Sequence, residues 1–214
     1  MQGTIRCVVV AGMLVGCHAD DTTGADAAVG PSGMIVQWST APGLPSSIDN
    51  GISIERARFA LGSLRVVGDA GPGDPRTTAS AVEMCFAWSA LCANPEDIAF
   101  DDAPTGLYSQ VALEFDGDSN DAYEIRGHVV VGSDELEYRI EDSSPLAFNV
   151  DIDEMVSPGE TATVKLRINF AHALEAVAWD TIDVNDGRLE LASGDAQMSS
   201  FRAKLAESFE IEAN

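Results

Sequence analysis

Basic residues are scarce in this sequence. Its 214 residues include 12 lysines and arginines against 35 aspartates and glutamates, which gives a formal net charge of −23. Proteins that bind nucleic acid use clustered lysines and arginines to neutralise phosphates, and no such cluster occurs along this sequence. We therefore expect no nucleic-acid partner. Acidic surfaces also keep exported proteins soluble, which is the simplest explanation of the charge.

Long hydrophobic runs are missing apart from one at the N-terminus. There a single basic residue, Arg6, precedes an apolar run from Cys7 to Val15, and the small residue Gly16 follows. This layout is typical of a secretory signal. The run has about half of the ~20 residues that a membrane-spanning helix needs. We expect residues 1–16 to direct export and not to span a membrane.

The end of this segment resembles the lipobox of bacterial lipoproteins. Leu14, Val15, Gly16 and Cys17 fill the four positions of that motif. The resemblance implies that Cys17 carries the lipid and that residues 1–16 are removed, leaving 11 basic and 35 acidic residues and a charge of −24. Two or three acyl chains suffice for stable anchoring. The alternatives are a non-lipidated signal that ends by chance in cysteine, or an apolar N-terminus retained in the cytosol.

The residues after the lipobox are small and acidic. Residues 17–32 contain almost no large apolar side chain, so they predict a flexible tether, and residues 33–214 predict a single folded domain. The residue after the lipobox cysteine is His18 and not aspartate. Under the enterobacterial sorting rule this favours the outer membrane, so we expect a lipid-anchored protein of the cell envelope with an envelope or extracellular partner.

Cysteine is also rare, with four residues in the chain. Cys7 belongs to the signal and Cys17 to the lipobox, which leaves Cys85 and Cys92. An even pair in an exported chain indicates a disulfide. A metal or redox site is the alternative, but it favours a Cys-x-x-Cys spacing or nearby histidines.

Alternating apolar and polar residues dominate the middle of the chain and predict short strands separated by turns. The predicted strands cover 33–40, 52–67, 110–115, 123–131, 136–140, 146–152 and 164–170. In the strand at 52–67 the alternation of apolar and polar residues shifts by one residue twice, which predicts bulges near Glu55 and Gly62. The fold class we expect is all-β, an antiparallel immunoglobulin-like sandwich. Apolar residues spaced by three and four between Met198 and Phe209 predict a short C-terminal amphipathic helix.

Three segments resemble a bacterial family of lipoproteins with a β-sandwich domain of unknown function. They are the strand at 52–67, residues 103–108 leading into the strand at 111–115, and residues 156–161 leading into the strand at 164–170. The resemblance implies a sandwich over about residues 33–191. Some periplasmic copper-binding lipoproteins share a similar layout, but this chain lacks their histidine-rich motifs.

Candidate metal ligands gather in one loop. Asp116, Asp118, Asn120 and Asp121 supply the hard oxygen atoms that Ca²⁺ prefers, although the loop departs from the EF-hand pattern. A hairpin turn rich in Asp and Asn explains the same residues. We therefore expect no cofactor. The alternative is a bound metal ion, with calcium ahead of copper.

Motifs for catalysis are lacking. No Gly-x-Ser-x-Gly occurs, and the histidines in the predicted domain are His128, on the polar side of a strand, and His172, for which Asp180 or Asp183 could serve as partner. We expect no enzyme and no catalytic residue, but a non-enzymatic binding or structural protein. A metal-binding module is the second hypothesis, and an enzyme acting on envelope polymers is the third.

Overall fold

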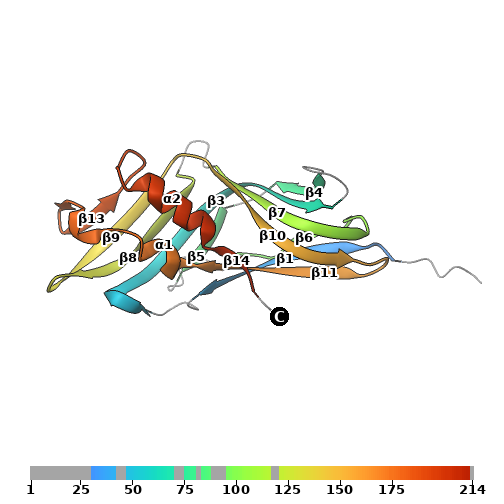
Figure 1. Ribbon diagram of the computed structural model, residues 1–214, viewed down its shortest axis with the longest axis horizontal. Coiled ribbons are helices and arrows are strands. Elements are labelled where there is room, and N and C mark those ends of the chain that lie inside the picture. The colour runs from blue at the N-terminus through green and yellow to red at the C-terminus, as the bar shows by residue number, and fades with distance from the viewer. Residues whose placement is uncertain are drawn as a thin grey trace, which may run out of the picture.

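The chain folds mainly into β-strands, as the alternation predicts. The computed structural model describes residues 30–41, 47–69, 75–80, 83–87, 95–116 and 121–212. Figure 1 shows an elongated molecule. Its described strands form two sheets, and the described residues also include two short α-helices. The strands are β1 (Gly33–Ala41), β2 (Ser47–Ile48), β3 (Ile52–Gly68), β4 (Pro75–Ser80), β5 (Glu83–Ala87), β6 (Ile98–Phe100), β7 (Gly106–Phe115), β8 (Tyr123–Val131), β9 (Asp134–Asp142), β10 (Leu146–Val156), β11 (Thr161–Asn169), β12 (Val184–Asn185), β13 (Arg188–Leu191) and β14 (Phe209–Ile211). The α-helices are α1 (Phe170–Leu174) and α2 (Met198–Glu207), and short 3-10 turns cover Asp49–Gly51 and Trp179–Thr181.

The large sheet is organised along β3, which has 17 residues. One half of β3 pairs with β8 and β5, and the other half pairs with β7 and β4, all antiparallel. β10 continues the sheet beyond β7, while β9, β13 and β12 continue it beyond β8. β7 and β8 therefore lie end to end along β3, and β9 and β10 lie end to end in the next row.

Breaks in neighbouring rows of this sheet fall at the same level. Phe115 ends β7 opposite Leu61, and Tyr123 begins β8 opposite Phe59. The intervening residue of β3, Ala60, accepts a hydrogen bond from the amide of Asp116 and donates one to the carbonyl of Ala122. In the next row the break lies between β9 and β10. The large sheet is thus divided into two halves, and a different set of elements can pack on each half.

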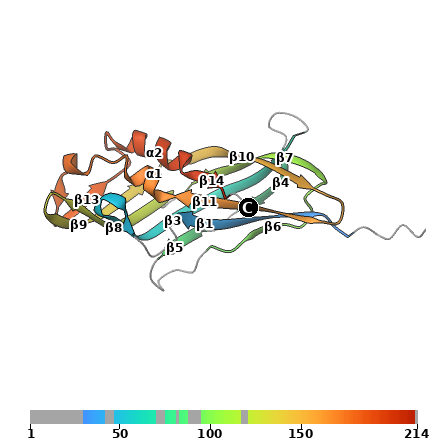
Figure 2. The ribbon, with the colours of Figure 1, turned by 60° about the horizontal axis from the view of Figure 1, so that its bottom comes forward.

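The two halves are covered differently. Figures 1 and 2 show α1 and α2 over the half that contains β8 and β9, and the small sheet against the half that contains β7 and β10. In the small sheet the strand order is β14-β11-β1-β6. α2 buries its apolar side through Met198, Phe201 and Leu205. The expected helical run to Phe209 is shorter, because Phe209 begins β14.

The strands are not all antiparallel, so a purely antiparallel sandwich was wrong in this detail. β1 pairs with β11 in parallel over nine residues, and β9 pairs with β13 in parallel over four. The cause is visible in Figure 1: β1 and β11 both start at the same end of the molecule. There the amide of Gly33 donates a hydrogen bond to the carbonyl of Glu160, 3.0 Å away. Parallel pairing follows because both strands run away from that end.

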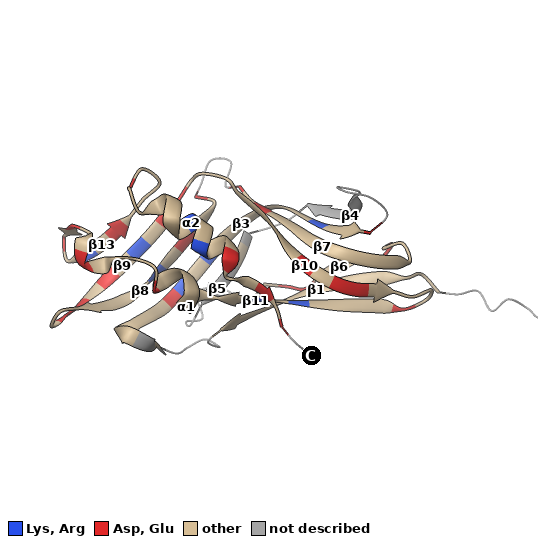
Figure 3. Ribbon diagram, viewed as in Figure 1, with Lys and Arg blue, Asp and Glu red and all other residues tan. Residues whose placement is uncertain are grey.

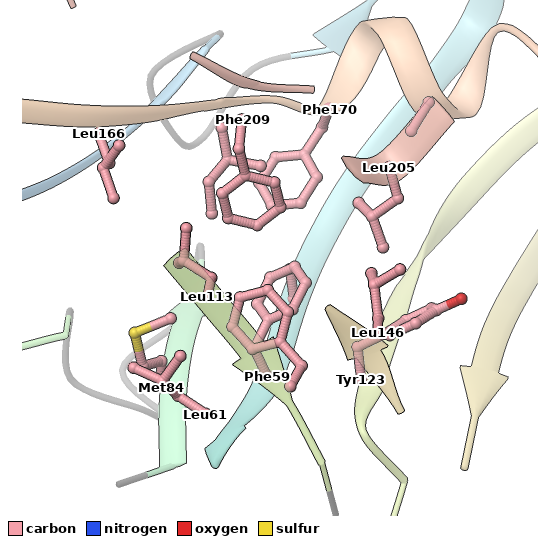
Figure 4. Close-up of a cluster of buried hydrophobic side chains, with 14 of the residues drawn as sticks. Phe59, Leu61, Met84, Leu113, Tyr123, Leu146, Leu166, Phe170, Leu205 and Phe209 are labelled. Atoms are coloured by element: carbon pink, nitrogen blue, oxygen red, sulfur yellow. The ribbon is translucent and has the colours of Figure 1, made fainter. Parts of the chain in front are cut away.

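Aromatic side chains fill the core where the two halves meet. The ring centroids of Phe59 and Phe115 are 5.0 Å apart, and Phe209 lies 4.8 Å from Phe148 and 5.5 Å from Phe115. Figure 4 shows Phe170 and Phe209 on one side of the core facing Phe59 on the other. Burial of such rings supplies a large apolar area and favourable edge contacts. This cluster holds the helices and both sheets together.

The two bulges predicted in β3 are confirmed. The pairing register shifts between Ile54 and Arg56 on the β8 side, and between Leu61 and Ser63 on the β7 side. The extra residues are Glu55 and Gly62. The bulges keep the apolar residues of β3 buried on both sides of each slip, including Ile54, Ala57, Phe59, Leu61 and Leu64.

Gly127 in β8 is required by a close backbone contact. A Cβ atom at this position would lie 1.9 Å from the carbonyl oxygen of Ser53 and 2.9 Å from the hydroxyl oxygen of Tyr138. Tyr138 is the partner of Gly127 in β9 and is fully buried. Its hydroxyl oxygen lies beside the space that the glycine leaves open.

We expect Gly127→Ala to lower the free energy of unfolding by about 3 kcal/mol or more, because the methyl group meets backbone that cannot move aside. Chemical denaturation of the purified variant measures this. Gly194→Ala is the control, because a Cβ there meets nothing within 4 Å. Equal stability of the two variants would contradict the close-contact interpretation.

Candidate functional site

Several residues singled out from the sequence lie outside the described part of the chain. These are Cys17, Cys92, Asp118 and Asn120. Cys85 belongs to β5, where its backbone is the register partner of Arg58. The lipid anchor, the disulfide between Cys85 and Cys92, and half of the candidate calcium loop therefore stay predictions.

The two described members of the calcium loop have protein partners. Asp121 lies 3.9 Å from the guanidinium of Arg58, and the amide of Asp116 is bonded to β3. Among the described residues, no group of three or more His, Cys, Asp or Glu side chains is arranged to hold a metal ion. A cation bound by Asp121 would have to compete with Arg58.

Both histidines lie beside glutamates, and the partner of His172 is not Asp180 or Asp183, the two aspartates that the sequence suggested for it. His128 Nδ1 lies 3.3 Å from Glu55, and His172 Nε2 lies 3.2 Å from Glu207 on α2. All four side chains are exposed by 38% or more. Contacts between such exposed side chains contribute little to stability.

Four arginines surround one buried carboxylate on the large sheet. The side chain of Glu124 in β8 is 3% exposed. It accepts hydrogen bonds from Arg56 Nη2 at 2.7 Å, Arg126 Nε at 2.7 Å and Arg139 Nε at 2.8 Å. Arg58 lies farther away, at 3.9 Å. The arginines that are dispersed along the sequence thus form a cluster in space, and the sequence analysis missed it.

The protonation of Glu124 follows from these contacts. Burial by itself raises the pKa of a carboxyl group, but hydrogen bonds and charge from the arginines outweigh it, so the pKa of Glu124 is lowered. Glu124 is therefore ionised over the physiological pH range. The sequence indicates only part of this cluster, because it places Glu124 and Arg126 on the same polar face of β8. The register of β8 with β3 and β9 brings the other arginines to them.

This Arg–Glu124 cluster lies on the face of the sheet opposite the helices. Tyr123 and Ile125, the neighbours of Glu124 in β8, are buried in the core. Successive side chains of a strand point to opposite faces, so Glu124 and Arg126 point outward. Figure 3 shows basic residues gathered in this half of the molecule, whereas β10 in the other half carries acidic residues.

A second buried carboxylate, Asp142 at the end of β9, ties α2 to the sheet. It has no exposed area. Arg202 of α2 donates to both of its oxygens, from Nε and from Nη2 at 2.9 Å, and the hydroxyl of Tyr123 donates at 2.9 Å. The amide of Ser144 donates at 3.0 Å. Both oxygens of Asp142 and the hydroxyl of Tyr123 thus have partners within the fold, and these contacts join α2 to the end of β9.

Comparison with protein-family profiles, curated proteins and solved structures finds no match to this chain. Within the described residues, no helix has the length and apolar character needed to cross a membrane. The site must therefore be interpreted from its own chemistry.

One surface depression, with a volume of about 340 Å³, lies beside β12 and β13. Asp183, Glu190 and Asp195 contribute carboxylates to its wall. Asp195 accepts a hydrogen bond from the amide of Ala192 at 2.6 Å, and the side chain of Gln197 bonds to Ala178 and Thr181. Asp195 and Gln197 thus hold the loops in place.

Acid sensitivity is the expected consequence of the Asp142 site. Burial alone raises the pKa of Asp142, but hydrogen bonds from Arg202, Ser144 and others bring it to about 2. This is below the value of about 3.9 for an unfolded aspartate. The stabilisation is therefore fully present above pH ~4 and is lost as the pH falls from ~4 to ~2.

We expect the free energy of unfolding of the native protein to fall more steeply between pH ~4 and ~2 than that of Asp142→Asn, which lacks the titrating group. At neutral pH the same variant should be less stable by about 2 kcal/mol, because Arg202 loses its charged partner. Urea denaturation at a series of pH values measures both. Asp153→Asn, at an exposed position of β10, is the control; an unchanged slope in Asp142→Asn would refute the assignment.

Proposed function

We propose that this chain is a lipid-anchored protein of the bacterial cell envelope with a non-enzymatic binding role. The observation that carries the proposal is the lipobox-like motif that ends in Cys17, after a short apolar segment of signal type. The acidic composition suits an exported protein. An outer-membrane location, an envelope or extracellular partner and the absence of a catalytic step belong to the same proposal.

The shape of the domain supports presentation of a surface away from an anchor. β1 begins at one end of the elongated molecule, and β9, β13 and α2 lie toward the other end (Figure 1). Residues 17–32 add 16 residues before that strand, which span at most about 55 Å when extended. The half of the sheet that carries the Arg–Glu124 cluster thus lies at the end of the domain far from the start of β1, and a tether of this length would let it reach beyond the bilayer surface.

We also propose that the sandwich is a variant of the immunoglobulin-like type. Support comes from two facing sheets, mostly antiparallel pairing and a shared aromatic core. The parallel β1–β11 and β9–β13 pairs and the end-to-end strand rows would be elaborations of that plan. The fold alone assigns no activity.

Lipidation is testable by metabolic labelling. In bacteria that express the full chain and are fed an alkyne-bearing palmitate, we expect label on the native protein and its recovery with membranes. Cys17→Ala should lose the label and leave the membrane fraction, because the acceptor thiol is gone. Cys7→Ala is the control, since that cysteine precedes the proposed cleavage site. Equal labelling of native protein and Cys17→Ala would contradict the proposal.

A further inference from the structure

Three arginines stand side by side across neighbouring strands. Arg56 of β3 is the register partner of Arg126 of β8, and Arg126 is the register partner of Arg139 of β9. Adjacent strands in a sheet are about 4.8 Å apart, and like charges placed directly opposite each other destabilise a sheet. Such a row of arginines therefore requires negative charge close by.

The described part of the chain supplies only part of that charge. Glu124 contacts all three arginines, and Glu141 pairs with Arg139 at 2.5 Å. Among the described side chains in direct contact, three guanidinium groups face two carboxylates, which leaves one positive charge in excess in a chain whose net charge is −23. The arginine row is thus a local positive site on an acidic protein.

The three guanidinium groups are also close enough to share one ligand. All of them contact the same carboxylate, so the three guanidinium groups converge on one point of the sheet, where a second anion would meet all three. Each guanidinium has five N–H donors, and the side chains are 28% to 33% exposed. Glu124 fixes these side chains from below, which reduces the entropy that ligand binding would cost.

We propose that Arg56, Arg126 and Arg139 form a binding site for a phosphate group, held in position by Glu124. Arginine donors match phosphate oxygens in pairs, and a dianionic phosphate monoester offers several acceptor oxygens to three guanidinium groups. A single carboxylate carries less charge and would compete with the many carboxylates of the protein itself. This inference rests on the proposed binding role and names its ligand class.

Titration calorimetry of the full-length chain with inorganic phosphate tests the site. At pH 8 and constant ionic strength we expect saturable binding of one phosphate. Arg126→Gln should weaken it about tenfold or more, because it removes a charge-assisted donor. Arg167→Gln is the matched control: Arg167 is similarly exposed and ion-paired, but to Glu210 in the small sheet. Absence of saturable binding, or equal weakening by both variants, would overturn the proposal.

Glu124→Gln provides a second test, whose expected result would not occur if the cluster were purely structural. The variant keeps the shape of the side chain and removes its charge, leaving the arginines without their shared anion. We expect phosphate to raise its melting temperature more than that of the native protein, because phosphate replaces the missing negative charge. An equal or absent shift in the two proteins would count against a phosphate site.

Lipid vesicles distinguish the source of the phosphate group. Vesicles that contain phosphatidic acid and displace inorganic phosphate would assign the site to a lipid headgroup, whereas phosphate binding without vesicle binding would assign it to a soluble ligand. Binding of vesicles without any binding of inorganic phosphate would overturn the proposed site. Failure of phosphate binding leaves the Cys17 labelling result unaffected, so the two proposals fail separately.

Discussion

The register of β3 is the constraint on which the rest of the structure depends. A shift by one residue turns every following side chain to the opposite face of a sheet, and β3 makes two such shifts, at Glu55 and Gly62. The first places Ala57 and Phe59 in the core and Arg56 outside. Without it, Arg56 would point among the apolar side chains under the helices. The aromatic core and the arginine row are therefore two results of one bulge.

The strands that could be predicted from the sequence are those with one buried and one solvated face. β7 to β11 alternate because their apolar side chains meet the core on one side only, and the two slips in β3 are visible as breaks in that alternation. β6 and β14 have three residues each, too few to show a period. The parallel β1–β11 pair was not predictable, because it depends on where each strand begins.

The Arg–Glu124 cluster shows a similar limit. In the sequence Glu124 belongs to the polar phase of β8, which predicts a solvated side chain. It is buried because arginines from three strands cover it. Long charged side chains from neighbouring strands can bury one another on the outer face of a sheet. The residue pattern within one strand does not reveal this burial. The register between strands decides which charged side chains meet. The sequence specifies that register only through the bulges and the buried face.

The two buried carboxylates of the large sheet have opposite charge balances, and this difference separates their roles. Asp142 faces one arginine, and neutral donors from Tyr123 and Ser144 complete its hydrogen bonds. The charges of that site balance, so it fastens α2 to the sheet and has no excess charge for a ligand. Glu124 accepts hydrogen bonds from three arginines, of which one, Arg139, is also paired with Glu141. Its site keeps an excess positive charge and partly exposed donors, which are the properties an anion requires.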